Sequence, residues 1–434
     1  MNSKTTMKLT LGVFLAAAAL WTSWNIWRYA VDIPFQDGWE FFYRYQAFKT
    51  GSFELSDLTS AHNEHRVFVP MTLLTLNALL LDWNIKATLL FSVLLATLTA
   101  FVLIWLAYST LRQRGVDHLL VCIVIVMQIF NMAQFANWLW EWDFQWFIAN
   151  VLAVGTFVFL FVATRRDTPS IYVALAALSA FAASFSLASG LCLWPLGFVY
   201  LLIEPRLRKF AVIWLIASVA VFVLYFYGLP ASKAPPAPSF GKWIPMIAEF
   251  TARLLGSTLD SKFVWGGVLI VVGAVASLLC LSSEDKRSRA LPWIGIAAYA
   301  GGGALMAAVG RAHWLGPQEG SQTRYSTIAG IFVLAVAVIV VIAASRKMAR
   351  VAASAFAVVL VVQAAIHYPV GYAGFFWLST RMADGRECLL RDSHDNDCVA
   401  KLYFAEGVQS VRDKWQRLRE LNWRGTHENN SPSG

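Results

Sequence analysis

ATLLFSVLLATLTAFVLIWLAYST, residues 87–110, contains no charged residue. A helix of about 20 such residues crosses the hydrocarbon core of a bilayer, which is roughly 30 Å thick. Similar stretches recur along the chain between short polar segments. Of the 434 residues, 58% are apolar and 14% are charged, whereas a soluble domain has about 25% charged residues. The sequence therefore predicts a membrane protein and excludes a soluble enzyme, a secreted disulfide scaffold and a nucleic-acid binder.

Eleven apolar stretches are predicted to span the membrane. They are residues 9–27, 87–110, 118–134, 145–163, 170–188, 190–203, 210–228, 263–282, 290–309, 326–344 and 350–367. Residues 67–82 are apolar but too short for a regular span, so we expect an interfacial or re-entrant helix there. The expected fold is an all-α polytopic transmembrane helix bundle. Residues 1–367 would form the transmembrane module, with a long outward first loop (28–86), and residues 368–434 a small polar tail.

The net charge of +9 comes from Lys and Arg clusters in every second connection. The clusters are Lys4 and Lys8, Arg112 and Arg114, Arg165 and Arg166, Arg206 to Lys209, Lys286 to Arg289, and Arg346 to Arg350. Basic residues favour the cytoplasmic side of a membrane. The charge therefore indicates orientation, and the remaining connections and the tail are predicted to face outward.

Two further outward features stand out. Residues 240–258 carry apolar residues at helical spacing, which predicts an amphipathic helix on the outer membrane surface. Cys388 and Cys398 are the only cysteines in the polar tail, and in an oxidising compartment they could form a disulfide.

The first outward loop places Asp37 among aromatic residues and follows it with NEHR at 63–66. A carboxylate against apolar walls near a bilayer has a raised proton affinity, which suits a general base. Glu64, His65 and Arg66 would orient the reacting groups or bind sugar hydroxyls. The alternative is a solvated loop with ordinary ion pairs.

The second loop is QFANWLWEWDFQW, residues 134–146. Glu141 and Asp143 form an E-x-D pair that could hold a divalent cation such as Mg²⁺ or Mn²⁺ through oxygen ligands. Trp138 and Trp142 offer indole rings that could stack on a sugar. The alternative is that the tryptophans are membrane-edge anchors.

The third loop is GRAHWLGPQEGSQTRYS, residues 310–326, bracketed by Arg311 and Arg324. Outward-facing arginines run against the charge bias, so each is expected to have an anionic partner. Guanidinium groups suit a pair of phosphate oxygens. The alternative partner is internal, a salt bridge to Asp37 or Glu64.

Together these features resemble the GT-C superfamily of polytopic glycosyltransferases, which use polyprenyl-phosphate-linked sugars. The chain looks closest to bacterial GT-C-like membrane proteins that share three motifs. Here these are NEHR at 63–66 followed by Pro70, G-L-x-x-W-P at 190–195, and G-R…R-Y at Gly310–Arg311 and Arg324–Tyr325.

The resemblance implies a glycosyltransferase of the bacterial inner membrane whose active site faces the periplasm. By position, the superfamily's first-loop carboxylate, a base or metal ligand, corresponds to Asp37. Glu141 and Asp143 resemble the acidic pair of the oligosaccharyltransferase branch. This chain lacks that branch's large C-terminal soluble domain, so transfer of one sugar is expected rather than of a preassembled oligosaccharide.

The expected reaction is inverting transfer to a periplasmic glycan, lipopolysaccharide or pilin, with Asp37 as base and Arg311 and Arg324 stabilising the leaving phosphate. One alternative is a flippase or transporter of a lipid-linked glycan, which would place ionisable residues inside the spans. Another is an O-antigen polymerase or ligase, which differs mainly in its donor.

Overall fold

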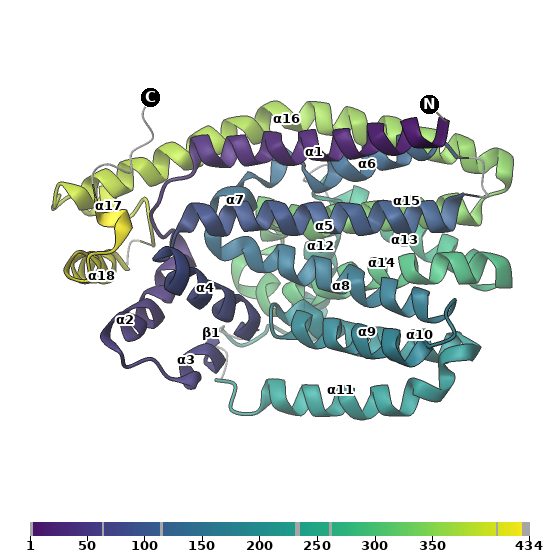
Figure 1. Ribbon diagram of the computed structural model, residues 1–434, viewed down its shortest axis with the longest axis horizontal. Helices are drawn as coiled ribbons and strands as arrows, with labels where there is room; N and C mark the ends of the chain where they lie inside the picture. Colours follow the sequence, from purple (N-terminus) through teal and green to yellow (C-terminus); the bar gives the residue numbers. More distant parts are fainter. Residues whose placement is uncertain are drawn as a thin grey trace.

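The computed structural model describes residues 3–62, 65–112, 116–230, 235–259, 263–404 and 407–427. It is almost entirely helical, which confirms the all-α class (Figure 1). Among the described residues, eight helical segments are long and apolar enough to cross a membrane, and each coincides with a predicted span. The other three predicted spans are also helical, as α1, α9 and α10. Because α9 and α10 are short, the count of eleven spans stays a prediction.

The helices along the predicted spans have the following bounds. They are α1 (Ser3–Tyr29), α5 (Ile85–Leu111), α6 (His118–Ile129), α8 (Phe144–Ala163), α9 (Pro169–Ser184), α10 (Leu193–Ile203), α11 (Ala211–Phe226), α13 (Phe263–Leu281), α14 (Glu284–Leu315), α15 (Ser326–Ala343) and α16 (Arg346–Leu390). Short 3-10 segments precede several of them, namely η4 (Ala188–Cys192), η5 (Pro205–Phe210), η6 (Pro317–Ser321) and η7 (Thr323–Tyr325).

The first loop is folded and contains more than the expected short helices. Its elements are η1 (Gln36–Phe41), α2 (Phe42–Thr50), α3 (Leu55–Thr59), the antiparallel strands β1 (Ala61–His62) and β2 (His65–Arg66), and α4 (Phe68–Leu81). The hairpin was not predicted, and it pairs His62 with His65 across the two strands. Helix α4 covers the short apolar segment. Its Val69 backbone N–H donates to the Phe185 carbonyl (3.0 Å), which joins α4 to the end of α9.

The other two outward loops differ from their predicted bounds. Helix α6 ends at Ile129, and the chain continues through η2 (Met132–Gln134), α7 (Phe135–Leu139) and η3 (Glu141–Asp143). Helix α14 runs on to Leu315, so Arg311 lies on its last turns rather than in a loop. The second loop is therefore a chain of short helices, and the third is shorter than predicted.

Helix α12 (Phe240–Gly256) confirms the amphipathic helix expected at 240–258. Its apolar side chains Ile247, Phe250 and Leu254 are buried, and the helix packs against α13 and α14. The hydrophobic spacing thus marks the face that contacts the protein.

Helix α16 does not stop at residue 367, where the tail was predicted to begin. It has 45 residues, which at about 1.5 Å each gives about 68 Å, more than twice the thickness of a hydrocarbon core. It carries α17 (Asn396–Val399), α18 (Val408–Glu420) and η9 (Arg424–Thr426) to the end of the bundle where α2 to α4 lie (Figure 1).

The tail is docked on the first loop. The Trp423 indole N–H donates to the Asp82 carbonyl (3.1 Å), and its ring packs on Trp83 with centroids 5.2 Å apart. Arg424 Nε lies 3.0 Å from a carboxylate oxygen of the buried Asp32. The tail is therefore an integral part of this end of the molecule.

Cys388, near the end of α16, is joined to Cys398 of α17 in a disulfide. We expect both thiols to resist a maleimide reagent in unreduced protein and to react after reduction, because disulfides persist in oxidising compartments. The measurement is the mass shift of the denatured protein. Labelling of both cysteines without reductant would contradict the pairing. Cys192, which is only partly buried, serves as a free-thiol control.

The charge bias predicts which end of the bundle faces outward. Alkaline phosphatase, which is active only outside the cytoplasm, should be active when fused after Ser56 and inactive when fused after Lys347. Colony activity, normalised to fusion abundance, measures this. An inactive Ser56 fusion at normal abundance would overturn the predicted side of the first loop.

Candidate functional site

The structure brings the three predicted loops together around Asp143. This aspartate, at the end of η3, is 2% exposed, and Trp146 of α8 forms a hydrogen bond with its carboxylate. Arg324, Asp37 and Arg311 are all within electrostatic reach of it. A buried carboxylate needs neighbouring positive charge, and the two arginines provide it. Asp143 therefore links the first loop, η7 and α14.

Asp37 lies at the open edge of this cluster. One of its carboxylate oxygens is 3.9 Å from Nε2 of His62, and its side chain is 35% exposed. The His62 ring rests against Trp142, with centroids 4.6 Å apart. The carboxylate is thus held by a partner yet open to an incoming group. Trp142 itself is 4% exposed, so it supports His62 and offers little surface to a sugar.

Tyr325 holds the two arginines of the third motif. Its side chain is fully buried, and its hydroxyl accepts a hydrogen bond from Arg311 Nη1 (2.8 Å). The Arg324 guanidinium lies 5.3 Å from the centre of the Tyr325 ring. Arg324 also forms a 2.7 Å ion pair with Glu319. Among the described residues, the ion-pair partner of Arg324 is thus a residue of its own loop and not Asp37; the other alternative partner, Glu64, lies outside the described residues.

Beside this cluster lies a cavity of ≈ 350 Å³. Arg311, His65, Trp146 and Ser189 supply its polar groups, and most of the remaining lining is apolar. The apolar lining includes Leu187, Leu191, Phe226, Leu229, Met306, Ala307 and Trp314. Because Trp146 contacts Asp143 and Arg311 lines the cavity, the cavity opens next to the charged cluster. Its lining suits a ligand with an anionic end and a hydrocarbon body.

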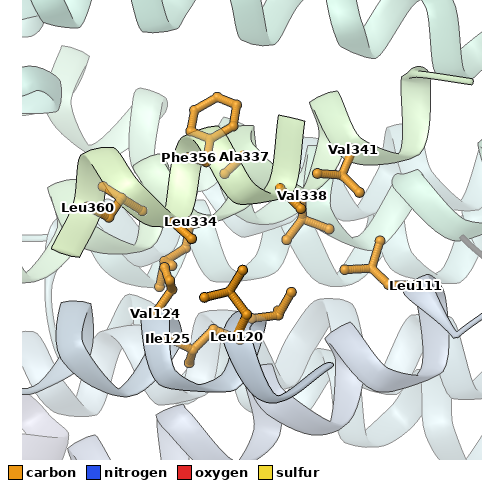
Figure 2. A pocket seen from close by; sticks show the side chains of 13 residues that line it. Leu111, Leu120, Val124, Ile125, Leu334, Ala337, Val338, Val341, Phe356 and Leu360 are labelled. Atoms are coloured by element: carbon orange, nitrogen blue, oxygen red, sulfur yellow. The ribbon is translucent and has the colours of Figure 1, made fainter. Parts of the chain in front are cut away.

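A second cavity is a packing gap lined only by apolar residues. It is ≈ 40 Å³ in volume and lies between α5, α6, α15 and α16. Its lining consists of hydrocarbon side chains such as Leu120, Val338 and Leu360 (Figure 2). Because no lining residue has a polar side chain that could orient a ligand, we assign this cavity no functional role.

Two predicted ligand-binding residues make contacts within the protein. Arg66 directs its guanidinium to three backbone carbonyls, those of Tyr225 (2.6 Å), Thr59 (3.1 Å) and Tyr227. Those donors are therefore occupied, and Arg66 ties the first loop to the end of α11. Trp138 is fully buried, with its ring centroid 4.7 Å from that of Phe147. It has no exposed face on which a sugar could stack.

Glu141 contacts a different part of the first loop from Asp143. Glu141 is 1% exposed and lies directly under Gly38, where an added Cβ would be 2.0 Å from its Oε1. A larger residue at position 38 would force the Glu141 carboxylate to move. Within the described ranges, no three His, Cys, Asp or Glu side chains group as a metal site would. Glu64 lies outside the described residues.

The tail also reaches the site, which sequence reasoning missed. The Gln36 backbone N–H, next to Asp37, donates to the Leu402 carbonyl (2.9 Å). Burial, and then the negative charges of Glu40 and Asp37, raise the pKa of Tyr403. Lys414 Nζ lies 3.5 Å from a carboxylate oxygen of Glu40. Residues far apart in sequence thus brace the segment that carries Asp37.

Other site residues were also missed. Trp146 closes the quoted second loop, and its position beside Glu141 and Asp143 was a usable signal. Tyr225 lines the cavity from the end of α11, and nothing in the local sequence marks it.

Comparison of the chain with protein-family models and with curated protein sequences finds no match.

Proposed function

We propose that this protein is an inner-membrane glycosyltransferase that moves one sugar from a polyprenyl-phosphate donor to a periplasmic acceptor. The supporting observation is the cavity of ≈ 350 Å³ with Arg311 and His65 among its polar groups and mostly apolar walls. A lipid-linked sugar phosphate has matching chemistry, with an anionic phosphate next to a long hydrocarbon chain. Guanidinium groups are well suited to phosphate oxygens.

The proposed step is an inverting displacement. The acceptor hydroxyl oxygen attacks the anomeric carbon and forms the new glycosidic bond. The bond between that carbon and the phosphate oxygen breaks, and polyprenyl phosphate leaves with the electron pair. Asp37, which is accessible at the edge of the cluster, takes the hydroxyl proton. Arg311, with Arg324 behind it, stabilises the charge that grows on the leaving phosphate.

Asp143 and Tyr325 act as positioning residues in this scheme. Tyr325 holds Arg311 through its hydroxyl, and the buried Asp143 balances both arginines. Because they are almost fully buried, they set the direction of the guanidinium groups and do not contact the sugar.

The test is sugar transfer by purified protein in detergent, from a synthetic polyprenyl-phosphate donor to lipopolysaccharide, periplasmic glycan or pilin. Arg311→Lys keeps the charge but loses the planar fork, so the KM for the donor should rise while acceptor dependence stays unchanged. Arg253→Lys is the matched control, because Arg253 pairs with Glu249 on α12 and is not among the cavity-lining residues.

The same protein in liposomes tests the flippase alternative. Detergent removes the membrane barrier, so transport cannot be mistaken for transfer there. Absence of transfer to all three acceptors, together with measurable translocation of a lipid-linked glycan in liposomes, would overturn the proposal. Transfer that needs a preassembled glycan on a pyrophosphate donor would indicate the polymerase or ligase class instead.

A further inference from the structure

A second polar cavity lies at the end of the bundle opposite the first loop. Its volume is ≈ 380 Å³, and it is lined by Tyr108, Ser109, Thr110, Arg112, Arg165 and Arg289. The three arginines come from three separate parts of the chain, directly after α5, just after α8 and early in α14. Helix α5 starts beside α4 and carries its last turn to the other end (Figure 1). In the sequence these arginines marked orientation only, but the fold gathers them around one space.

The cavity is positively charged. None of its lining residues is acidic. Asp285 forms an ion pair with Arg289, and the Asp285 side chain is 66% exposed. Burial lowers the pKa of Arg165, and the charges of Arg289 and Arg112 lower it further. The lining residues thus carry three positive charges and no negative charge, which favours an anionic ligand.

An aromatic ring also restrains the Arg165 side chain. Its guanidinium carbon is 3.9 Å from the centre of the Phe161 ring, which is a close cation–π contact. Such stacking restrains the planar group while its N–H donors stay available at the edges. The arrangement is typical of recognition of a phosphate by oriented guanidinium groups.

An exposed apolar stripe leads along α5 to this cavity. Leu94 (60% exposed), Leu98 (47%), Phe101 (59%), Trp105 (41%) and Tyr108 (43%) follow one another at alternating spacings of four and three. That spacing places them on one face of the helix. Tyr108 belongs to both the stripe and the cavity lining, so a hydrocarbon chain on this face would end at the arginines.

We propose that this cavity binds the phosphodiester headgroup of an anionic membrane phospholipid, with an acyl chain lying along the α5 stripe. A free phosphate ion shares the headgroup's chemistry, but it has no hydrocarbon chain that could contact the apolar stripe on α5. Basic pockets between transmembrane helices at the cytoplasmic face commonly bind such headgroups. The site is separate from the one proposed for sugar transfer and does not depend on it.

The experiment is native mass spectrometry of the full-length protein in detergent, titrated with phosphatidylglycerol or with phosphatidylcholine. We expect one tightly bound phosphatidylglycerol and no comparable phosphatidylcholine. Replacing Arg112, Arg165 and Arg289 together by Gln should weaken phosphatidylglycerol binding about 100-fold, because each basic residue near a membrane surface contributes about fivefold. Should the triple variant fail to fold, Arg165→Gln alone should weaken binding about fivefold.

The matched control replaces Arg166, Arg346 and Arg350 by Gln. These three are exposed, lie in connections assigned to the same side, and are not among the residues lining the cavity. The control should keep wild-type binding. Equal binding of both lipids, equal weakening by the control, or unchanged binding in the triple variant would each overturn the proposal. Displacement of phosphatidylglycerol by millimolar inorganic phosphate would overturn the lipid assignment and indicate a soluble phosphate ligand.

Discussion

Replacing Asp37 by Asn should lower the rate of sugar transfer by about 10²- to 10⁴-fold, the usual contribution of a general base. The asparagine keeps the size and polarity of the side chain but cannot accept the proton of the acceptor hydroxyl. Asp37 is 35% exposed, and Nε2 of His62 lies 3.9 Å from its carboxylate. Folding should therefore change little. The measurement is kcat with the synthetic donor, beside a thermal unfolding curve.

Glu40→Gln is the control for this substitution. Glu40 lies in the same 3-10 segment, and it pairs with Lys414 away from the cavity. Glutamine keeps a side-chain oxygen that can accept a hydrogen bond from Lys414, so the contact with the tail is retained and kcat should stay close to that of the wild type. Near wild-type transfer by Asp37→Asn would remove Asp37 from the mechanism. An equal fall in both variants would show that any lost carboxylate in this segment is harmful, which would contradict a role as base.

Replacing Trp423 by Ala should destabilise the protein by about 3–5 kcal/mol, the usual cost of truncating a buried aromatic residue to alanine. Trp423 is fully buried, packs on Trp83 and donates to the Asp82 carbonyl. Its removal leaves a hole between the tail and the first loop. Because the tail braces Gln36, transfer should fall together with stability. Thermal unfolding in detergent and transfer at low temperature measure the two effects.

Phe404→Ala is the control, and it tests whether truncating any aromatic residue of the tail destabilises the protein. Phe404 is 59% exposed, so its truncation should leave the unfolding temperature nearly unchanged. An unfolding curve for Trp423→Ala that coincides with the wild type would show that the tail does not hold the first loop. Lost stability with full transfer activity would show that the tail does not position Asp37.

The approximate positions of the polar segments between the apolar helices could be predicted from the sequence, because hydrophobic length is a local property. A run of apolar residues and the Lys or Arg residues beside it decide whether a segment crosses and in which direction. Polar residues that avoid the spans then collect in the outward loops. This reasoning found Asp37, Arg311, Arg324 and Asp143, and the structure places all four in one electrostatic cluster.

The roles inside that cluster could not be predicted in the same way. Arg66 carries the same guanidinium as Arg311, yet its donors are taken up by carbonyls near the end of α11 and in α3. Trp138 and Trp146 have similar neighbours in sequence, yet one is packed in the core and the other lines the cavity. A side chain's free donors and exposed faces depend on which distant segments contact it.

The sequence by itself determined the all-α membrane class, the approximate positions of the apolar helices and the grouping of chemistry-bearing residues, since these follow from hydrophobic length, periodicity and charge. Only the tertiary structure decided that the tail folds back onto Asp37, that Glu141 packs beneath Gly38 and that three arginines of separate connections line one cavity. Those features are contacts between residues far apart along the chain, and they come from side-chain packing, which no local pattern encodes.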